Sequence, residues 1–264
     1  MKVSLLISTY NWPEALELVL KSVIDQSVMP LEILIADDGS SEETLKVIEN
    51  FRIQNNVKII HIWHKDDGFR KTFILNKAIA KSKGDYIIQT DGDCILHSDF
   101  VKDHIHFSKP NVYLYGSRVT ISEGFTKQLF MLKKTNFNLF SKGISKRTRA
   151  LRIPLFSSFY KEKLELSKKL RGCNVSYWKK DFIAVNGYNQ DMTGWGREDS
   201  ELMVRMMNNG VKSRRIRYSG IVFHIWHKIF SKHNLNKNDV IQQKAIEEKI
   251  KRCKNGVDDY LINE

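Results

Sequence analysis

The sequence predicts an α/β protein in which a mostly parallel central sheet is flanked by helices on both faces. In the first 93 residues, short apolar stretches of strand length alternate with longer stretches whose apolar residues fall on one helical stripe. The short stretches are nearly continuous in apolar residues, as in strands buried on both faces. Right-handed crossovers between parallel strands bring the carboxyl ends of these strands to one edge, where ligands bind.

Each expected strand of this half ends in a polar loop. The expected strands are residues 2–8, 31–36, 57–63 and 86–90. Three helices are expected between these strands. The first begins at Pro13, the second carries Leu45, Ile48 and Phe51, and the third covers residues 70–82. The loops after the strands are residues 9–11, 37–40, 66–70 and 91–93. These loops are therefore expected to meet at one edge of the sheet and to form a binding site there.

The sequence Asp91-Gly92-Asp93 follows a short apolar strand. Side chains alternate faces along a strand, so Asp91 and Asp93 can point the same way at its carboxyl end. Gly92 allows the backbone to turn and a ligand to approach closely. Two neighbouring carboxylates repel each other unless a cation lies there, and Mg²⁺ and Mn²⁺ bind carboxylates together with substrate phosphates. The pattern indicates a divalent-metal site, and the alternative is a solvated turn.

The composition limits the classes of partner. The 264 residues include 42% hydrophobic residues, enough for a substantial core, and carry a net charge of +13. A charge of this size indicates an anionic partner: nucleic acid, an anionic membrane surface or a phosphorylated substrate. Neither G-x-G-x-x-G after the first strand nor G-x-x-x-x-G-K-[ST] occurs in the sequence. Their absence argues against dinucleotide binding of the usual type and against P-loop chemistry.

The cysteines and the hydropathy indicate a cytoplasmic protein. Cys94, Cys173 and Cys253 are odd in number and far apart, so neither a disulfide framework nor a zinc site is expected. No stretch approaches the roughly 18–20 apolar residues of a membrane span. If the protein works at a membrane, it is expected to lie on the inner face as a peripheral protein.

A basic segment lies in the middle of the chain. Between residues 126 and 180 lysine and arginine are frequent, and Glu162 and Glu165 are the only acidic residues. We interpret residues 117–171 as a basic insert within one domain. It is either a solvated basic face or a surface that contacts anionic lipid or a phosphorylated glycan. The final residues, from 236 to 264, read as a charged amphipathic helix that packs on the core.

Two later stretches carry further candidate site residues. In Gly194-Trp195-Gly196-Arg197-Glu198-Asp199, two glycines flank an aromatic ring, and a helix is expected to begin near Glu198. An ordinary helix N-terminus explains the acidic pair but not the Gly-Trp-Gly before it. The apolar strand expected at 221–227 contains His224 and His227. If that strand continues, the two rings face opposite ways and one of them can ligate a metal; if it breaks after His224, both can.

In their order along the chain, these motifs resemble family 2 glycosyltransferases, which have the nucleotide-sugar-dependent GT-A fold. The resemblance rests on Ser8-Thr9-Tyr10-Asn11, Asp37-Asp38-Gly39-Ser40, Asp91-Gly92-Asp93, Gly172-Cys173-Asn174 and Trp195-Gly196-Arg197-Glu198-Asp199. The last motif also resembles the acceptor motif of β-1,4-galactosyltransferases and chondroitin polymerases. The implied organisation is a glycosyltransferase domain over residues 1–230 and a helical tail over 231–264. Within the domain, residues 1–93 form the nucleotide-binding half, and residues 94–230, with the insert, form the acceptor-binding half.

The resemblance implies a role for each matching residue on the donor side. Thr9 and Tyr10 would line the nucleobase pocket. Asp38 would hydrogen-bond the uracil or ribose, with Asp37 as a second candidate. Arg70 would lie in the loop that approaches the base and the diphosphate.

The resemblance also implies a metal site. Asp93 would bind Mn²⁺ or Mg²⁺ directly, and Asp91 would touch the ribose or the metal. His224 and His227 match the region of the family that supplies a further metal ligand.

On the acceptor side, Asp199 would be the general base, and Glu198 would bind hydroxyls of the donor or acceptor. Trp195, next to Gly194, would stack on the acceptor sugar. The implied activity is inverting transfer of a sugar from a UDP-sugar to a glycan or lipid-linked glycan, in bacterial surface polysaccharide or lipopolysaccharide synthesis. The alternatives are a non-catalytic binder of anionic glycan or nucleic acid, and a nucleotidyltransferase.

Overall fold

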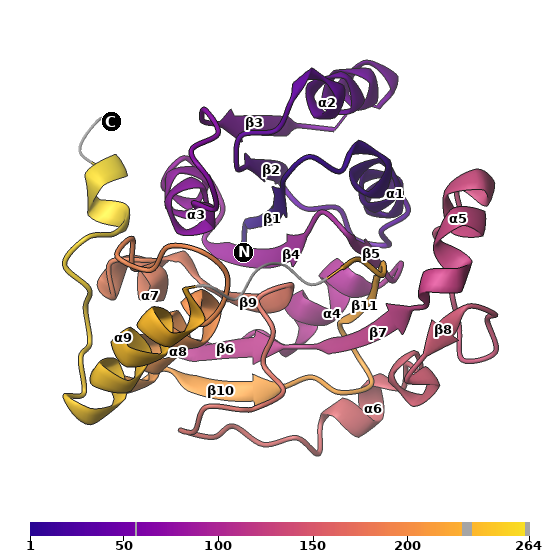
Figure 1. Cartoon of the computed structure of the whole chain (residues 1–264). Helices are drawn as coiled ribbons and strands as arrows, with labels where there is room; N and C mark the ends of the chain where they lie inside the picture. The colour runs from indigo at the N-terminus through magenta and orange to yellow at the C-terminus, as the bar shows by residue number, and fades with distance from the viewer. Residues whose placement is uncertain (56, 229–233, 262–264) are drawn as a thin grey trace.

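The computed structural model describes residues 1–55, 57–228 and 234–261, which form two sheets with helices packed around them (Figure 1). The larger sheet has seven strands in the order β10-β6-β9-β4-β1-β2-β3. Their bounds are β1 Val3–Thr9, β2 Glu32–Asp37, β3 Ile59–Trp63, β4 Tyr86–Asp91, β6 Val112–Tyr115, β9 Asn174–Trp178 and β10 Lys212–Arg215. Strand β9 runs antiparallel to both of its neighbours, and the other pairs are parallel. The expected mostly parallel sheet is confirmed.

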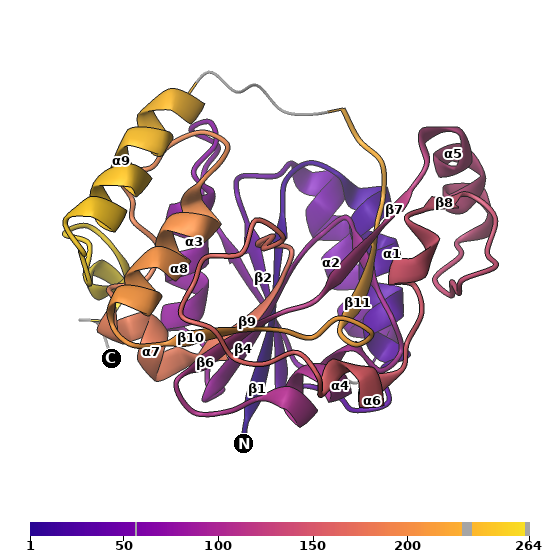
Figure 2. The same ribbon diagram turned by 90° about the horizontal axis from the view of Figure 1, so that it is seen from below.

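Helices cover both faces of this sheet, and their bounds are α1 Pro13–Ile24, α2 Glu42–Gln54, α3 Lys71–Ala80, α4 Phe100–Phe107, α7 Lys179–Ala184, α8 Glu198–Asn208 and α9 Leu235–Glu247. Helices α3, α7 and α8 pack on the face that carries Leu6 and Ile87. Helices α1, α2 and α4 pack on the opposite face, which carries Leu5 and Ile88 (Figure 2). Neighbouring residues of one strand thus enter two separate cores, which explains why the strands are apolar at nearly every position.

A second, smaller sheet was not expected from the sequence. Its strands follow the order β5-β11-β7-β8, with bounds β5 Cys94–Leu96, β11 Ile221–His224, β7 Ser117–Ile121 and β8 Ile144–Ser145. Strand β11 pairs antiparallel with β5 and parallel with β7. The sheet therefore joins the chain just after Asp93 to segments that lie far away in the sequence.

The basic segment 117–171 supplies two strands of this smaller sheet. It also contains α5 Glu123–Leu132, the short helix η1 Arg147–Arg149 and α6 Pro154–Ser157. Leu129, Phe137 and Ile144 are buried in a cluster with Phe223 and with α1. Other apolar side chains of the segment are exposed, including Phe140 at 85% and Phe159 at 73%. The segment is therefore packed on one side and presents apolar and basic side chains to solvent on the other.

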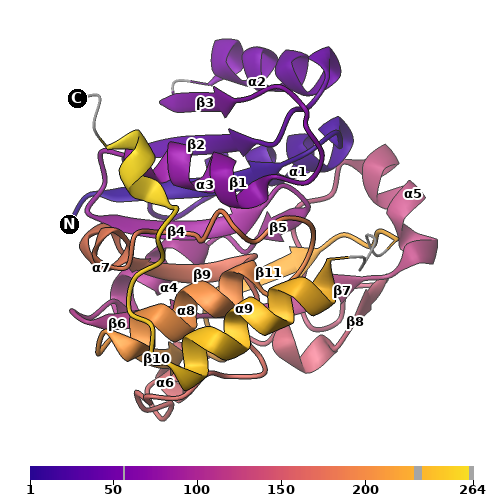
Figure 3. The same cartoon turned by 60° about the vertical axis from the view of Figure 1, so that its left-hand side comes forward.

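Helix α9 lies beside α8 (Figure 3). It ends at Glu247, so the expected helix over 236–264 is shorter than predicted. The chain then continues through Cys253 and Gly256 to the short helix η2 Val257–Tyr260, which packs on α3. A Cβ at Gly256 would lie 1.9 Å from the carbonyl oxygen of Asn186, so this segment is pressed against the core rather than helical. The proposed boundary at residue 230 and the chain end at 262–264 lie outside the described residues.

None of the helices in the described ranges has the length and apolar character that crossing a membrane requires.

Candidate active site

The loops after β1, β2 and β4 meet at the carboxyl edge of the large sheet, as predicted. Ser8 pairs with Asp91, and Thr9 pairs with Asp37. The backbone N–H of Gly92 donates to the carbonyl of Ser8 at 2.7 Å. A Cβ at Gly92 would lie 3.0 Å from Oγ1 of Thr9. Gly92 does not have a positive φ. The glycine therefore allows two loops to approach each other closely, and its backbone conformation is open to other residues as well.

Asp93 lies between two histidines. Its Oδ2 is 3.5 Å from Nε2 of His224 and 3.3 Å from Nε2 of His227. Within the described residues, these three side chains form a group whose ligand atoms all lie within 4.8 Å of one another. One carboxylate oxygen and two imidazole nitrogens are a donor set that suits a divalent transition ion such as Mn²⁺. Asp91 lies outside this group.

Both histidines reach Asp93 because β11 ends at His224. His224 pairs with Cys94 across the smaller sheet, directly after Asp93. The backbone N–H of Ile225 then donates to the carbonyl of Asp93 at 2.9 Å, and the chain turns so that the ring of His227 comes within 5.1 Å of that of His224. Of the two outcomes left open by the sequence, the structure shows the broken strand.

The pKa shifts of Asp93 and His224 fit metal binding, whereas the hydrogen bond to Asp93 raises the pKa of His227. Burial lowers the pKa of His224, which keeps its imidazole neutral at pH 7 and free to ligate. Burial alone would raise the pKa of Asp93, but the hydrogen bond from His227 and the charges of both histidines lower it to about 2. Asp93 is therefore a carboxylate at any physiological pH.

Asp91 has different partners from Asp93. Its Oδ1 accepts hydrogen bonds from the hydroxyl of Ser8 at 2.6 Å and from Nζ of Lys71 at 2.7 Å. Lys71 is the first residue of α3. Burial alone would lower the pKa of Lys71, but the carboxylates of Asp91, Glu198 and Asp199 together outweigh burial and raise it. Lys71 therefore stays charged and connects the end of β4 electrostatically with the start of α8.

The sequence analysis did not identify Lys71. The lysine follows Arg70 in the predicted loop and helix, and one more cation near a helix start is an ordinary feature of a basic chain. Only its position beside Asp91, twenty residues away, reveals it. The sequence offered one signal for Lys71, namely that loops 66–70 and 91–93 were expected to share one edge of the sheet.

Asp199 is held at the N-terminus of α8. Its Oδ2 accepts a hydrogen bond from the backbone N–H of Gly172, and its Oδ1 accepts one from the N–H of Ser200 at 2.9 Å. A Cβ at Gly172 would lie 3.0 Å from Oδ2 of Asp199, so this position needs a glycine if the carboxylate is to keep its place. The Gly172-Cys173-Asn174 and Glu198-Asp199 motifs, well separated in the sequence, therefore form one structural unit.

Glu198 precedes Asp199 and has an unusual protonation. Burial raises the pKa of Glu198, the neighbouring charge of Asp199 raises it further, and the result is a pKa of about 7 even though Lys71 opposes both effects. Oε2 of Glu198 accepts a hydrogen bond from the N–H of Gly196 at 3.0 Å. Glu198 therefore exchanges its proton near neutral pH, which is a property often found at functional sites.

The loop before α8 has a constrained backbone. Gly194, Gly196 and Arg197 all have positive φ, and Trp195 is half-buried between the glycines. A Cβ at Gly194 would lie 2.6 Å from Nδ2 of Asn234, so the loop is pressed against the residue before α9. Glycine is therefore required at 194 both for its conformation and for the lack of space.

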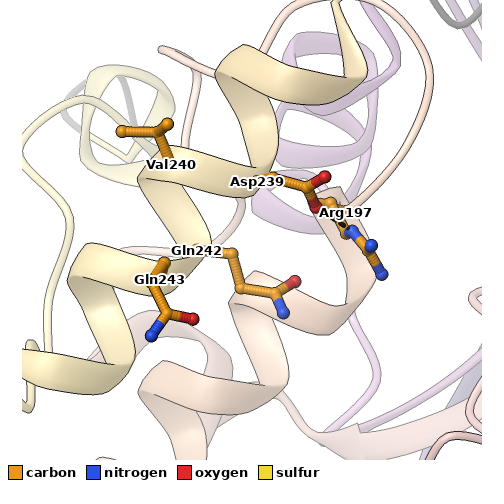
Figure 4. A pocket seen from close by; sticks show the side chains of 5 residues that line it. All are labelled: Arg197, Asp239, Val240, Gln242 and Gln243. Atoms are coloured by element: carbon orange, nitrogen blue, oxygen red, sulfur yellow. Dashed lines mark hydrogen bonds and ion pairs between the residues drawn. The ribbon is translucent and has the colours of Figure 1, made fainter.

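Helix α9 holds this loop in place. The buried Asn238 donates from Nδ2 to the carbonyl of Gly196 at 2.8 Å and to that of Thr193 at 3.3 Å. Arg197 and Asp239 form an ion pair on the surface next to a pocket lined by Arg197, Asp239, Val240, Gln242 and Gln243 (Figure 4). That pocket contains none of the predicted site residues. Its lining includes the ion pair between Arg197 and Asp239, which connects the loop to α9.

Asp37 and Asp38 have different surroundings. Asp37 is buried, and its two oxygens accept from the N–H of Ser40 at 2.8 Å and contact Nε2 of His61 at 2.9 Å. Asp38 is contacted by His64 Nε2 at 2.7 Å and accepts a hydrogen bond from the N–H of Arg70 at 3.0 Å. Burial raises the pKa of Asp38 in spite of these contacts. The structure thus uses Asp37 to shape the loop and connects Asp38 to the loop of Arg70.

The remaining donor-side candidates lie around Asp38. Thr9 is buried beside Gly92, and Tyr10 is exposed, with its hydroxyl donating to Asp66 at 3.0 Å. The guanidinium of Arg70 stacks on the ring of Phe73 and pairs with Asp67 at 2.7 Å. These side chains surround the loop of Asp38 at the edge of the sheet, and Thr9 lies between that loop and Gly92, next to Asp93.

Two family models match the chain. The model described as glycosyl transferase family 2 matches residues 4–164, more than half of the chain. The model described as N-terminal domain of galactosyltransferase matches residues 153–228, which include the Trp195–Asp199 motif and both histidines. The two matches together cover both halves of the site.

Curated relatives match most of this chain. It is 25% identical over 230 residues to a chondroitin synthase of Escherichia coli, with 81% of this chain and 33% of the relative covered. It is 24% identical over 226 residues to a hyaluronan synthase of Pasteurella multocida, with 79% of this chain and 23% of the relative covered. The chain thus spans a third or less of the length of these relatives.

Solved structures confirm the fold. Staphylococcus aureus TarS 1-349 in complex with UDP superposes with a TM-score of 0.66 at 16% identity, over 99% of this chain and 70% of TarS 1-349. GalNAc-T7 with UDP, GalNAc and Mn²⁺ superposes with a TM-score of 0.63 at 19% identity, over 86% of this chain and 44% of the other. Both are GT-A glycosyltransferases, and the expected GT-A fold is confirmed.

Proposed function

We propose an activity for this chain, which belongs to glycosyl transferase family 2. It transfers a sugar from a UDP-sugar to a hydroxyl of a glycan or lipid-linked glycan, with inversion at the anomeric carbon. The proposal places this reaction in the synthesis of a bacterial surface polysaccharide. Among similar structures, TarS has been solved with UDP-GlcNAc and a mannosyltransferase of Pyrobaculum calidifontis with GDP-Man and Mn²⁺. These complexes support a nucleotide-sugar donor, and the choice of UDP is part of our proposal.

Asp93, His224 and His227 would hold the divalent metal. The ion, when bound, supplies a Lewis acid for the negative charge that develops on the leaving diphosphate. Mn²⁺ fits the two imidazoles better than Mg²⁺, which prefers oxygen ligands. The carboxylate of Asp93 contributes a negative charge that is already present in the folded protein, since its pKa is lowered to about 2.

The donor nucleotide would lie along the loops of Thr9, Tyr10 and Asp38. Asp38 would accept a hydrogen bond from the uracil or ribose, and the loop of Arg70 would cover the base and diphosphate. Lys71 supports this arrangement because it holds Asp91 by an ion pair and keeps a positive charge where the diphosphate would arrive.

The acceptor hydroxyl would attack the anomeric carbon in a single displacement. A bond forms between the acceptor oxygen and the anomeric carbon, and the bond from that carbon to the diphosphate breaks. Its electron pair leaves with UDP, and the hydroxyl proton passes to the carboxylate of Asp199. Hydrogen bonds from the backbone N–H groups of Gly172 and Ser200 hold that carboxylate in position. Trp195 would stack on the acceptor sugar, and Glu198 would bind one of its hydroxyls.

One observation carries the proposal. The charge of Lys71 is stabilised jointly by Asp91 at the end of β4 and by Glu198 and Asp199 at the start of α8. The donor side and the acidic pair are therefore close enough to interact across one site. Separate, unrelated acidic clusters would not share a single, partly buried cation.

The test combines ligand binding with one variant. UDP and Mn²⁺ together are expected to raise the melting temperature more than either alone, since a ligand that binds the folded state stabilises it by mass action. Asp199→Asn preserves the shape of the side chain and is expected to keep this stabilisation while transfer is lost. A variant that still transfers sugar would remove Asp199 from its role. The absence of a joint effect of UDP and Mn²⁺ would refute the donor site.

A further inference from the structure

Six cations gather on the side of the molecule that carries the smaller sheet. We call Arg118, Lys146, Arg149, Arg171, Arg215 and Arg217 the cationic cluster. They come from β7, from the chain around η1, from the loop before β9, and from the end of β10 and the residues after it. In Figure 1 the chain leaving β10 passes below β7 towards α6 before it turns into β11, which brings these segments together.

The members of the cationic cluster are close to one another. Nη1 of Arg149 donates to the backbone carbonyl of Arg118 at 3.1 Å. Burial lowers the pKa of Arg149, and the charges of Arg215, Arg118, Arg217 and Arg171 lower it further. Like charges in contact are unfavourable unless something compensates them. The folded protein thus tolerates a concentration of positive charge that is only partly compensated internally, since Asp93 acts on the charge of Arg118.

Several arginines elsewhere in the chain form ion pairs with carboxylates. Arg152 is paired with Asp103 at 2.6 Å, and Arg205 is paired with Glu201 at 2.7 Å in the core. Within residues 1–55, 57–228 and 234–261, no member of the cationic cluster forms an ion pair with a carboxylate. In addition, Nε of Arg215 is buried without a hydrogen-bond partner. A buried donor without a partner costs stability, so the fold holds Arg215 in place at a cost that its internal contacts do not offset.

The cationic cluster adjoins the catalytic site. Arg118 pairs with Val222 in the smaller sheet, and Val222 lies two residues before His224 in the same strand. The side chains of Arg118 and His224 therefore share one face of that sheet. Arg171 directly precedes Gly172, whose N–H holds Asp199. The positive surface therefore begins on both sides of the reaction centre rather than on a remote face.

We infer that the cationic cluster binds anionic groups, phosphates or carboxylates, carried by sugar units of the acceptor glycan next to the unit that is glycosylated. This inference rests on the proposed function, because it names the chemical class of the acceptor. A guanidinium presents a planar fork of donors that matches carboxylate and phosphate oxygens. Arg215 lies 5.8 Å from the ring centre of Tyr160, and Arg217 lies 4.8 Å from that of Tyr218, so both guanidinium groups are already oriented.

A glycan fits the cationic cluster better than a lipid surface does. Arg118, Arg149 and Arg215 are half-buried and fixed by neighbouring groups, whereas adsorption to a membrane uses flexible, fully exposed cations. The exposed rings of Phe140 and Phe159 belong to the same basic segment. Binding to a membrane is therefore the competing outcome that the experiment must separate.

The experiment measures binding of three labelled probes by fluorescence anisotropy. The probes are an alginate hexasaccharide with carboxylates, a short-chain polyphosphate, and the neutral maltohexaose. The test variant is the triple substitution Arg149→Gln, Arg215→Gln and Arg217→Gln. A second variant replaces the same three residues by Lys and keeps their charge. The control variant carries Lys46→Gln, Lys251→Gln and Lys254→Gln, three exposed lysines outside the cationic cluster.

The protein is expected to bind alginate or polyphosphate in a salt-dependent manner and to bind maltohexaose at least about tenfold more weakly. The glutamine variant is expected to lose at least about tenfold in affinity for the anionic probe, because three charged guanidinium groups that would bind anions are removed. The control variant is expected to change by less than about threefold. The lysine variant is expected to bind more tightly than the glutamine variant and more weakly than the wild type, because lysine keeps the charge but lacks the planar fork. Which anionic probe binds more tightly distinguishes carboxylate from phosphate.

Three results would overturn the inference: equal binding of the neutral and anionic probes, an equal loss of affinity in the control variant, or binding to phosphatidylglycerol vesicles without binding to either anionic probe. The proposed function is tested separately by the joint stabilisation with UDP and Mn²⁺. Charge-dependent probe binding without that stabilisation would refute the transferase and leave a polyanion site. Joint stabilisation without charge preference would refute only the anionic acceptor.

Discussion

The ion pair between Lys71 and Asp91 gives the sharpest quantitative test of the site. Nζ of Lys71 lies 2.7 Å from Oδ1 of Asp91, and the two side chains are 19% and 26% exposed. Glu198 and Asp199 also act on the charge of Lys71. Lys71→Met leaves three carboxylates without their shared cation, whereas Asp91→Asn leaves Lys71 with two remaining counter-charges. We therefore expect Lys71→Met to destabilise the protein more than Asp91→Asn does.

The magnitude follows from the partial exposure of the pair. Exposed ion pairs contribute up to about 1 kcal/mol, and breaking a buried pair costs about 3–5 kcal/mol. A pair that is about one-fifth exposed lies between these limits, so Lys71→Met is expected to cost about 2–3 kcal/mol and Asp91→Asn about 1–2 kcal/mol. The coupling energy from the double variant is expected to be about 1–2 kcal/mol.

The assay is urea unfolding of the wild type, both single variants and the double variant at pH 7, without nucleotide or metal. Lys71→Met is also expected to raise the pKa of Glu198 above its value of about 7, because Lys71 opposes that rise. NMR titration of the Glu198 carboxyl measures this shift. A coupling energy below about 0.3 kcal/mol, or a larger cost for Asp91→Asn than for Lys71→Met, would refute the shared-cation interpretation.

Three further predictions concern acid–base behaviour, metal binding and the acceptor loop. The pKa of Glu198 is raised from 4.5 to about 7, so the folded protein holds a proton that the unfolded chain releases, and stability falls as pH rises through this window. Glu198→Gln is therefore expected to be more stable than the wild type at about pH 8 and equally stable at about pH 4, as measured by urea unfolding. His224→Ala and His227→Ala are each expected to weaken Mn²⁺ binding at least about tenfold in calorimetry, because each removes one of three ligands. Asn238→Ala is expected to lower kcat/KM for the acceptor about tenfold and leave the Kd for UDP unchanged, because its amide holds the loop around Trp195.

Matched controls accompany these predictions. His106 is exposed and lies away from Asp93, so His106→Ala should leave Mn²⁺ binding intact. Gln243 is exposed on the same helix as Asn238, and its amide donates a hydrogen bond to Glu247 of that helix, so Gln243→Ala should leave acceptor kinetics unchanged. A fall in UDP affinity in Asn238→Ala, or Mn²⁺ binding that survives the loss of either histidine, would contradict the roles given to these residues.

Local patterns in the sequence determined the α/β class and the edge of the sheet where the site lies. The apolar runs with helical stretches between them set the order of β1 to β4, because period and length are properties of neighbouring residues. The same order places Thr9, Asp38 and Asp91 at strand ends, so their common edge followed without coordinates. The Glu198-Asp199 pair was likewise recognisable as the start of a helix.

Tertiary packing decided the features that depend on residues far apart in the chain. The end of β11 at His224 turns two histidines towards Asp93, and no local period distinguishes that break from a strand that continues. Lys71 becomes part of the site only through Asp91 and the start of α8. Asp37, the second candidate after Asp38 in the sequence analysis, contacts Ser40 of its own loop and His61 of β3.

The cationic cluster also depends on residues that lie far apart in the chain. The sequence shows a basic segment over 117–171, but Arg215 and Arg217 lie outside it and join it only through the path of the chain after β10. Charge along a sequence is a sum over residues, whereas the field at a site depends on distance and burial. For this reason the chain by itself predicted an anionic partner, and only the folded structure showed that six cations gather beside the smaller sheet, with Arg118 and Arg171 next to site residues.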